Sequence, residues 1–122
     1  MKIEITGEQL TAAIREVVAE NPERVYEAPQ HMRIGGQTSA ECYYVHTDVD
    51  GENQQPGCVI GHALFRLGVP LWQLADGEGT TAFGVIPATT TLSDRDPAVV
   101  FANRVQDRQD LGATWADALR QA

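Results

Sequence analysis

An amphipathic segment near the N-terminus constrains the fold of this chain more than any other stretch. Four of its apolar side chains recur at the i, i+4, i+7 and i+8 spacing of one helical face: Leu10, Ile14, Val17 and Val18. Thr6 precedes the segment and Gln9 follows three residues later, which is the spacing of a capping box. Asn21 and Pro22 end the pattern. The sequence therefore predicts a helix over 7–20 that must bury one face.

Further helices are predicted downstream, at about 58–67, 70–75 and 94–110 and from 114 onward. Gly68 is predicted to end the first of these helices as its C-cap residue, and Pro70 suits the first position of the next helix. The inward side chains of the last two helices are expected to be Val100, Phe101, Val105, Trp115 and Leu119. Residues 82–86 fit a strand or a helical turn, and the "PATTT" that follows is predicted to be loop.

Short aromatic and β-branched runs at 23–30, "ERVYEAPQ", and 41–46, "ECYYVH", predict a pair of strands. The "MKIEI" of residues 1–5 alternates and predicts a further short strand, whereas "TDVDGENQQPG" is typical of a turn-rich loop. The expected fold class is α+β, a helix-rich compact domain with a small β-hairpin or sheet.

Length and charge exclude several classes of function. The chain has 122 residues, 43% of them hydrophobic, which suits one domain over 1–122 with one core. Its net charge of -8 and its pI near 4.7 disfavour nucleic acid and anionic membrane surfaces, since phosphates would be repelled. The opening "MKIEITGEQL" has no apolar run typical of a signal peptide, and no 18-residue apolar stretch occurs, so we expect a cytoplasmic protein.

Two Cys-x3-His pairs, Cys42 with His46 and Cys58 with His62, lie in one stretch of the sequence. Zinc prefers four nitrogen or sulfur ligands in a tetrahedron, so these four side chains are the candidate metal ligands, with zinc as the candidate cofactor. On a helix, Cys58 and His62 face the same side. On a regular strand, Cys42 and His46 would lie roughly 13 Å apart, so a zinc site requires the first pair to be bent.

Three other interpretations of the same residues stay open. Cys42 and Cys58 would close a loop of about sixteen residues as a disulfide, but a cytosolic setting disfavours it. Cys58 would be an activated thiol at a helix N-terminus, although no histidine follows His62 to serve in the usual cysteine-then-histidine order. The pattern favours the third interpretation, in which both thiols pack as small hydrophobes and His46 and His62 are partly exposed at element ends.

Several motifs together resemble a group of small proteins encoded by actinobacteria and their phages. They are "NPERVYEAP", "CYYVH", "PGCVIGHALFRLGVPLWQLA" and "VQDRQDLGATWADAL", the last with the pattern Q-x-x-Q-D-x-G-x-x-W. The resemblance covers most of the chain from about Asn21 onward and departs in the loop "TDVDGENQQ". It implies an actinobacterial or phage source and transfers no catalytic residue. Within the motif, Cys58 looks like a packing residue at a helix start, and Gly61 is expected to allow close helix packing.

No acid–base constellation accompanies the acidic composition. We therefore expect a small non-enzymatic accessory or regulatory protein that acts by binding another protein, in the bacterial host cytoplasm if it is phage-encoded. The alternative is a small metal- or thiol-dependent enzyme centred on Cys58 and His62. The oligomeric state is left open.

Overall fold

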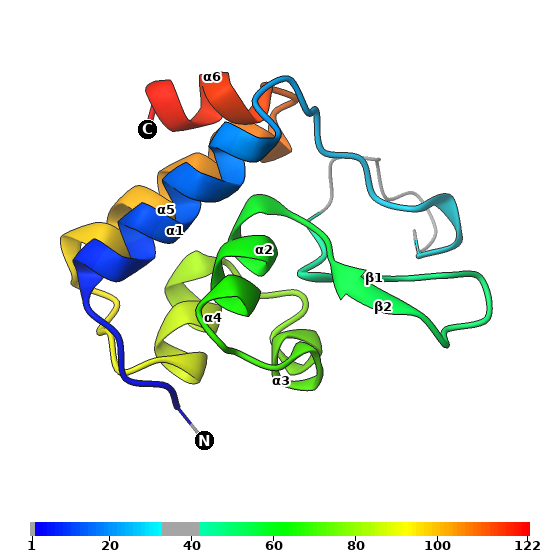
Figure 1. Ribbon diagram of the computed structural model, residues 1–122, viewed down its shortest axis with the longest axis horizontal. Helices are drawn as coiled ribbons and strands as arrows, with labels where there is room; N and C mark the ends of the chain where they lie inside the picture. The colour runs from blue at the N-terminus through cyan, green and yellow to red at the C-terminus, as the bar shows by residue number, and fades with distance from the viewer. Residues whose placement is uncertain (1, 33–41) are drawn as a thin grey trace.

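Two long helices, α1 (Gly7–Glu20) and α5 (Pro97–Asp110), pack side by side and form one wall of the molecule (Figure 1). The computed structural model describes residues 2–32 and 42–122. The other helices are η1 (Gln30–Met32), α2 (Val59–Arg66), α3 (Leu71–Asp76), α4 (Ala82–Thr89) and α6 (Trp115–Arg120). Strands β1 (Val45–Thr47) and β2 (Gln54–Pro56) form an antiparallel hairpin at one side. The fold class is α+β, as predicted.

Helix α1 has the bounds predicted from its sequence. The Thr6 side chain accepts from the Gln9 amide at 3.1 Å, and the Gln9 side chain accepts from the Thr6 amide at 2.8 Å, which completes the capping box. Its predicted apolar face is buried against α2, α5 and α6. Arg66 at the end of α2 adds ion pairs to Glu16 and Glu20 on the exposed side.

The predicted strand pair is wrong in one partner. Of residues 23–30, only Val25 takes part in β pairing, as an isolated bridge to Thr114. The partner of β1 is instead β2, which lies in the stretch "TDVDGENQQPG" that was predicted to be a loop. Of the predicted strand 41–46, residue 41 lies outside the described residues, Tyr44 is a bend, and the strand begins only at Val45. Segment 22–26 packs instead on α6, where the Trp115 amide donates to the Arg24 carbonyl at 2.8 Å. The predicted first strand is likewise reduced to a bridge between Ile3 and Thr90.

The predicted loop "PATTT" is largely helical. Helix α4 runs through Pro87, although proline cannot donate the i to i−4 hydrogen bond. Hydroxyl groups add hydrogen bonds to the last turn, since Thr89 Oγ1 donates to the Val85 carbonyl and Thr90 Oγ1 to the Ile86 carbonyl, both at 2.8 Å. Tertiary contacts with α5 therefore hold a helix that the local sequence disfavours.

The other helices begin and end close to the predicted positions. Asp96 caps α5, with Pro97 as its first residue, so this helix starts later than the predicted 94. The buried face of α5 is also rotated from the predicted one. Val105 is buried as expected, but Val100 and Phe101 are only partly buried, and Val99, Ala102, Gln106 and Gln109 face the core. Trp115 is fully buried and Leu119 partly buried.

None of the helices in residues 2–32 and 42–122 is both long and apolar enough to cross a membrane.

Candidate functional site

The structure brings the two cysteines of the predicted metal site together. The Sγ atoms of Cys42 and Cys58 lie 2.8 Å apart, with Cys42 as the donor. Cys58 is fully buried at the N-cap of α2 and Cys42 is partly exposed just before β1. The contact with Cys58 and burial raise the pKa of the Cys42 thiol well above its usual value. At neutral pH this thiol is therefore protonated.

The predicted partner histidines are engaged elsewhere. His46 lies in the middle of β1, where its Nε2 is 2.9 Å from the Tyr26 hydroxyl. That hydroxyl accepts the Tyr43 amide at 2.8 Å, so its own hydrogen is available to the imidazole. Burial lowers the pKa of His46, with smaller contributions from His31 and Arg24. The lowered pKa favours the neutral form of His46, which can accept this hydrogen.

His62 lies one turn into α2, facing α6. Its ring meets the Trp115 ring edge-on, with 5.6 Å between the ring centres, while the Arg24 guanidinium stacks on the same indole at 4.7 Å. Burial, followed by the charge of Arg24, lowers the pKa of His62 to about 4. The packing interpretation placed both histidines at element ends, and this is wrong, because His46 lies inside β1 and His62 inside α2. It also expected both to be partly exposed, and this is confirmed.

Within the described ranges 2–32 and 42–122, no group of three or more His, Cys, Asp or Glu side chains is arranged to hold a metal ion. The two sulfur atoms are adjacent, whereas His46 and His62 contact Tyr26 and Trp115 respectively. Zinc binding by these four residues stays a prediction, which native mass spectrometry of protein purified without chelator would test.

A thiol enzyme centred on Cys58 has little support from the geometry. Cys58 is 0% exposed, so a substrate carbonyl has no approach to its sulfur without local opening. Its nearest described partner is the Cys42 thiol rather than an imidazole base. The expectation that Cys58 packs at a helix start is confirmed by its place at the N-cap of α2.

The close approach around Cys58 depends on Gly61. A Cβ on Gly61 would lie 2.3 Å from the Tyr44 carbonyl oxygen, so no larger residue fits there. The expected close packing at Gly61 is confirmed, but its partner is the backbone before β1 rather than another helix. The amides of Gly57 and Cys58 donate to the Tyr44 and Tyr43 carbonyls at 2.9 and 3.0 Å, which fixes the two segments together.

Two buried glutamines on α5 were missed by the sequence analysis. The Gln109 Oε1 accepts from the Val59 amide at 2.9 Å, and the Gln106 Oε1 accepts from the Ala82 amide at 2.8 Å. Each amide belongs to the first residue of a helix whose own N-cap side chain makes no capping bond. Both glutamines lie in the tail pattern Q-x-x-Q-D-x-G-x-x-W. The sequence therefore showed the two residues, but it did not show which backbone amides they bind.

Gln106 also ties the cysteine pair to the core. Its Nε2 lies 2.9 Å from the Tyr44 hydroxyl and 3.2 Å from the Cys42 sulfur. The Tyr44 hydroxyl donates in turn to the Thr80 carbonyl at 2.5 Å. Glu78 completes this arrangement, because its carboxylate accepts the Tyr44 and Val45 amides at 2.7 and 3.3 Å. These groups hold the start of the hairpin, at Tyr44 and Val45, against the core.

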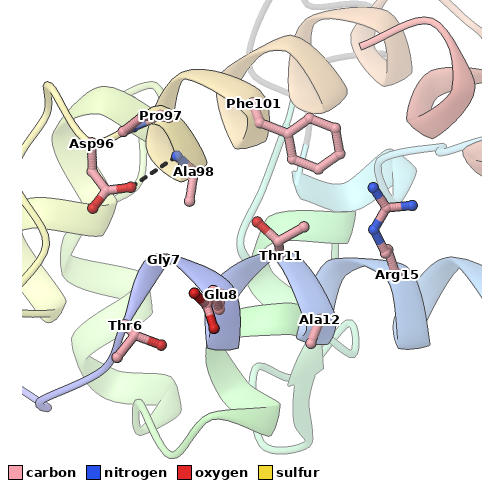
Figure 2. A pocket seen from close by; sticks show the side chains of 10 residues that line it. All are labelled: Thr6, Gly7, Glu8, Thr11, Ala12, Arg15, Asp96, Pro97, Ala98 and Phe101. Carbon is pink, nitrogen blue, oxygen red and sulfur yellow. Dashed lines mark hydrogen bonds between the residues drawn. The ribbon is translucent and has the colours of Figure 1, made fainter.

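A groove of about 670 Å³ lies between the N-terminal halves of α1 and α5, away from the cysteines (Figure 2). Gly7 allows the two helices to approach, since a Cβ there would lie 2.7 Å from the Asp96 carboxylate. Asp96 caps its own helix by accepting the Ala98 amide at 2.9 Å. We call this surface the α1–α5 groove, and Figure 2 labels the ten residues that line it.

The lining of the α1–α5 groove is mixed in character. Ala12 and Phe101 supply apolar surface from opposite helices, and the Arg15 guanidinium lies 5.8 Å from the centre of the Phe101 ring. Glu8 and Asp96 supply acidic groups at the other end. This combination suits recognition of a partner that is apolar on one face and charged beside it.

No protein-family model matches this chain, and neither a curated protein nor a solved structure matches it significantly. The resemblance to actinobacterial and phage proteins stays a prediction.

Proposed function

We propose that this protein is a small acidic, non-enzymatic accessory or regulatory protein that binds another protein through the α1–α5 groove. The observation that carries the proposal is the open groove of about 670 Å³, in which exposed Ala12 and partly exposed Phe101 offer apolar surface. A volume of this order accommodates several side chains of a partner. The resemblance adds a proposed origin, an actinobacterial phage, and with it a host protein as the partner.

The proposed occupant is an amphipathic helix with basic residues beside its apolar face. Its apolar side chains would pack on Phe101 and Ala12, in the manner of helix-in-groove recognition. Its basic residues would face Glu8 and Asp96 at the acidic end of the groove. The net charge of -8 favours a cationic partner further, because complementary charge speeds association and disfavours anionic competitors.

The proposal is tested with two designed helical peptides that share their apolar positions and differ in charge, one lysine-rich and one glutamate-rich. Binding is measured by fluorescence anisotropy at low and high salt. We expect the cationic peptide to bind and to weaken as salt rises, since salt screens exposed charges. We expect the anionic peptide to bind at least about tenfold more weakly.

Ala12→Arg and Ala19→Arg provide the matched variants. Both alanines are exposed on α1, but only Ala12 lines the groove. Ala12→Arg should weaken the cationic peptide at least about tenfold, because it adds bulk and like charge at the contact. Ala19→Arg should bind as the wild type does. Equal binding by both variants would contradict the groove as the site, and equal binding of both peptides would contradict the charge of the partner.

A further inference from the structure

The cysteine pair lies outside the α1–α5 groove and serves no purpose in the proposed binding function. Cys42 lies before β1 and Cys58 follows β2, so the two residues flank the hairpin. Their sulfur atoms are 2.8 Å apart, inside the roughly 3.5–4.0 Å at which non-bonded carbon atoms rest, and sulfur is the larger atom. The pair is therefore positioned for chemistry between the two sulfurs.

We propose that Cys42 and Cys58 form a redox modification site, which a small-molecule disulfide such as oxidised glutathione converts reversibly into an intrachain disulfide. The inference does not depend on the proposed binding function.

Backbone hydrogen bonds hold together the two segments that carry the pair. The Cys58 amide donates to the Tyr43 carbonyl at 3.0 Å and the Gly57 amide to the Tyr44 carbonyl at 2.9 Å. These bonds hold the segment of Cys42 against the start of α2. A disulfide has a sulfur–sulfur bond of about 2.05 Å, so a small rotation of the side chains brings the two atoms to bonding distance.

The difference in burial assigns the order of the steps. Cys42 is partly exposed and Cys58 is 0% exposed, so the oxidant meets Cys42. Because its pKa is raised, Cys42 reacts through the minor fraction of molecules in which it has lost its proton. Its sulfur attacks one sulfur of the small disulfide, which breaks that bond, forms a mixed disulfide and releases one small thiolate that takes up a proton. The Cys58 sulfur then attacks Cys42 and releases the second small thiol. Two electrons pass from the cysteines to the oxidant, and the two protons leave on the released thiols.

A second feature favours resolution within the chain. The Gln106 Nε2 lies 3.2 Å from the Cys42 sulfur, and the same group is held at 2.9 Å from the Tyr44 hydroxyl. This contact keeps Cys42 facing the core, where Cys58 is its nearest sulfur. A mixed disulfide at Cys42 should therefore be short-lived in the wild-type chain.

The test uses the full-length chain in mixtures of reduced and oxidised glutathione. Samples are quenched with acid, alkylated under denaturing conditions and weighed intact. We expect the wild type to lose the mass of two hydrogen atoms, to take up no alkyl group and to return to the dithiol when reduced glutathione is in excess. A persistent glutathione adduct, a disulfide-linked dimer or two alkylated thiols in excess oxidised glutathione would each overturn the proposal.

Two single variants test the order of the steps. Cys58→Ser should retain glutathione on Cys42, because no sulfur is left to displace it. Cys42→Ser should stay unmodified, because Cys58 is buried, and rapid glutathione uptake by this variant would overturn the assignment of Cys42 as the attacking sulfur. Ala12→Arg should form the disulfide as the wild type does, so failure of the binding proposal leaves this result intact.

Discussion

At the scale of single residues, position decides what each cysteine and histidine can do. Cys58 and His62 are four residues apart at the start of α2, yet Cys58 is the N-cap and contacts Cys42, whereas His62 contacts Trp115. Glu78 shows the same principle, since its carboxylate takes the two backbone amides at the start of β1. Burial raises the pKa of Glu78 even though the two amides oppose this effect.

Replacement of Cys58 tests its structural role. Cys58 is the N-cap of α2 and makes no side-chain capping bond. Serine at an N-cap accepts an amide that the first turn leaves unpaired, whereas alanine cannot. We expect Cys58→Ala to be less stable than Cys58→Ser by about 1 kcal/mol in urea unfolding. Equal stability of the two variants would mean that the hydroxyl finds no partner there.

At the scale of elements, α5 organises the helices around it. Its two buried glutamines supply the acceptors for the first amides of α2 and α4, whose N-cap side chains leave them unpaired. A buried amide without a partner costs about 1–3 kcal/mol, so these contacts fix where both helices start. Helix α4 depends on this support most, because Pro87 interrupts its internal hydrogen bonds.

Gln109→Met tests the cap on α2. Methionine keeps the length of the side chain but removes the acceptor for the buried Val59 amide. We expect a loss of about 1–3 kcal/mol in the free energy of unfolding, with an unchanged urea slope. Arg104→Met, on the exposed side of the same helix, should change stability by less than about 0.5 kcal/mol. A similar effect of both variants would argue against the capping role.

At the scale of the whole molecule, surface charge and buried titratable groups have opposite effects on the stability of the fold as the pH falls. Acid relieves the repulsion of a surface with a net charge of -8, and it protonates Glu78, whose pKa is raised in the fold. It also protonates His62 in the unfolded chain before the folded one, because the pKa of His62 is about 4 in the fold and 6.5 without it. The contribution of His62 to the free energy of unfolding is therefore lost as the pH falls from about 6.5 to about 4.

His62→Gln isolates that contribution. Between about pH 7 and pH 4 the wild type should lose more stability than the variant, by about 1–2 kcal/mol once solvent screening of this partly exposed side chain is taken into account, as measured by urea unfolding at each pH. His31→Gln changes an exposed histidine and is expected to keep the wild-type profile. Parallel profiles for the wild type and His62→Gln would show that His62 is protonated in the fold.

The sequence by itself determined the features that depend on near neighbours in the chain. The capping box and the bounds of α1, the N-cap of α6 at Thr114 and the end of α2 near Gly68 all rest on contacts within a few residues. Helical periodicity also separated most of the buried faces from the exposed ones. The closeness of Cys42 and Cys58 was one of several open interpretations of the sequence.

Only the tertiary structure decided the rest. The Val59 amide finds its acceptor 50 residues away and the Ala82 amide 24 residues away, so no local pattern predicts either partner. Helix α4 continues through Pro87 because α5 packs against it. The α1–α5 groove likewise exists only where the two helices meet. The physical reason is the same in each case. The two contacting groups are far apart in the sequence and come close only when the chain folds.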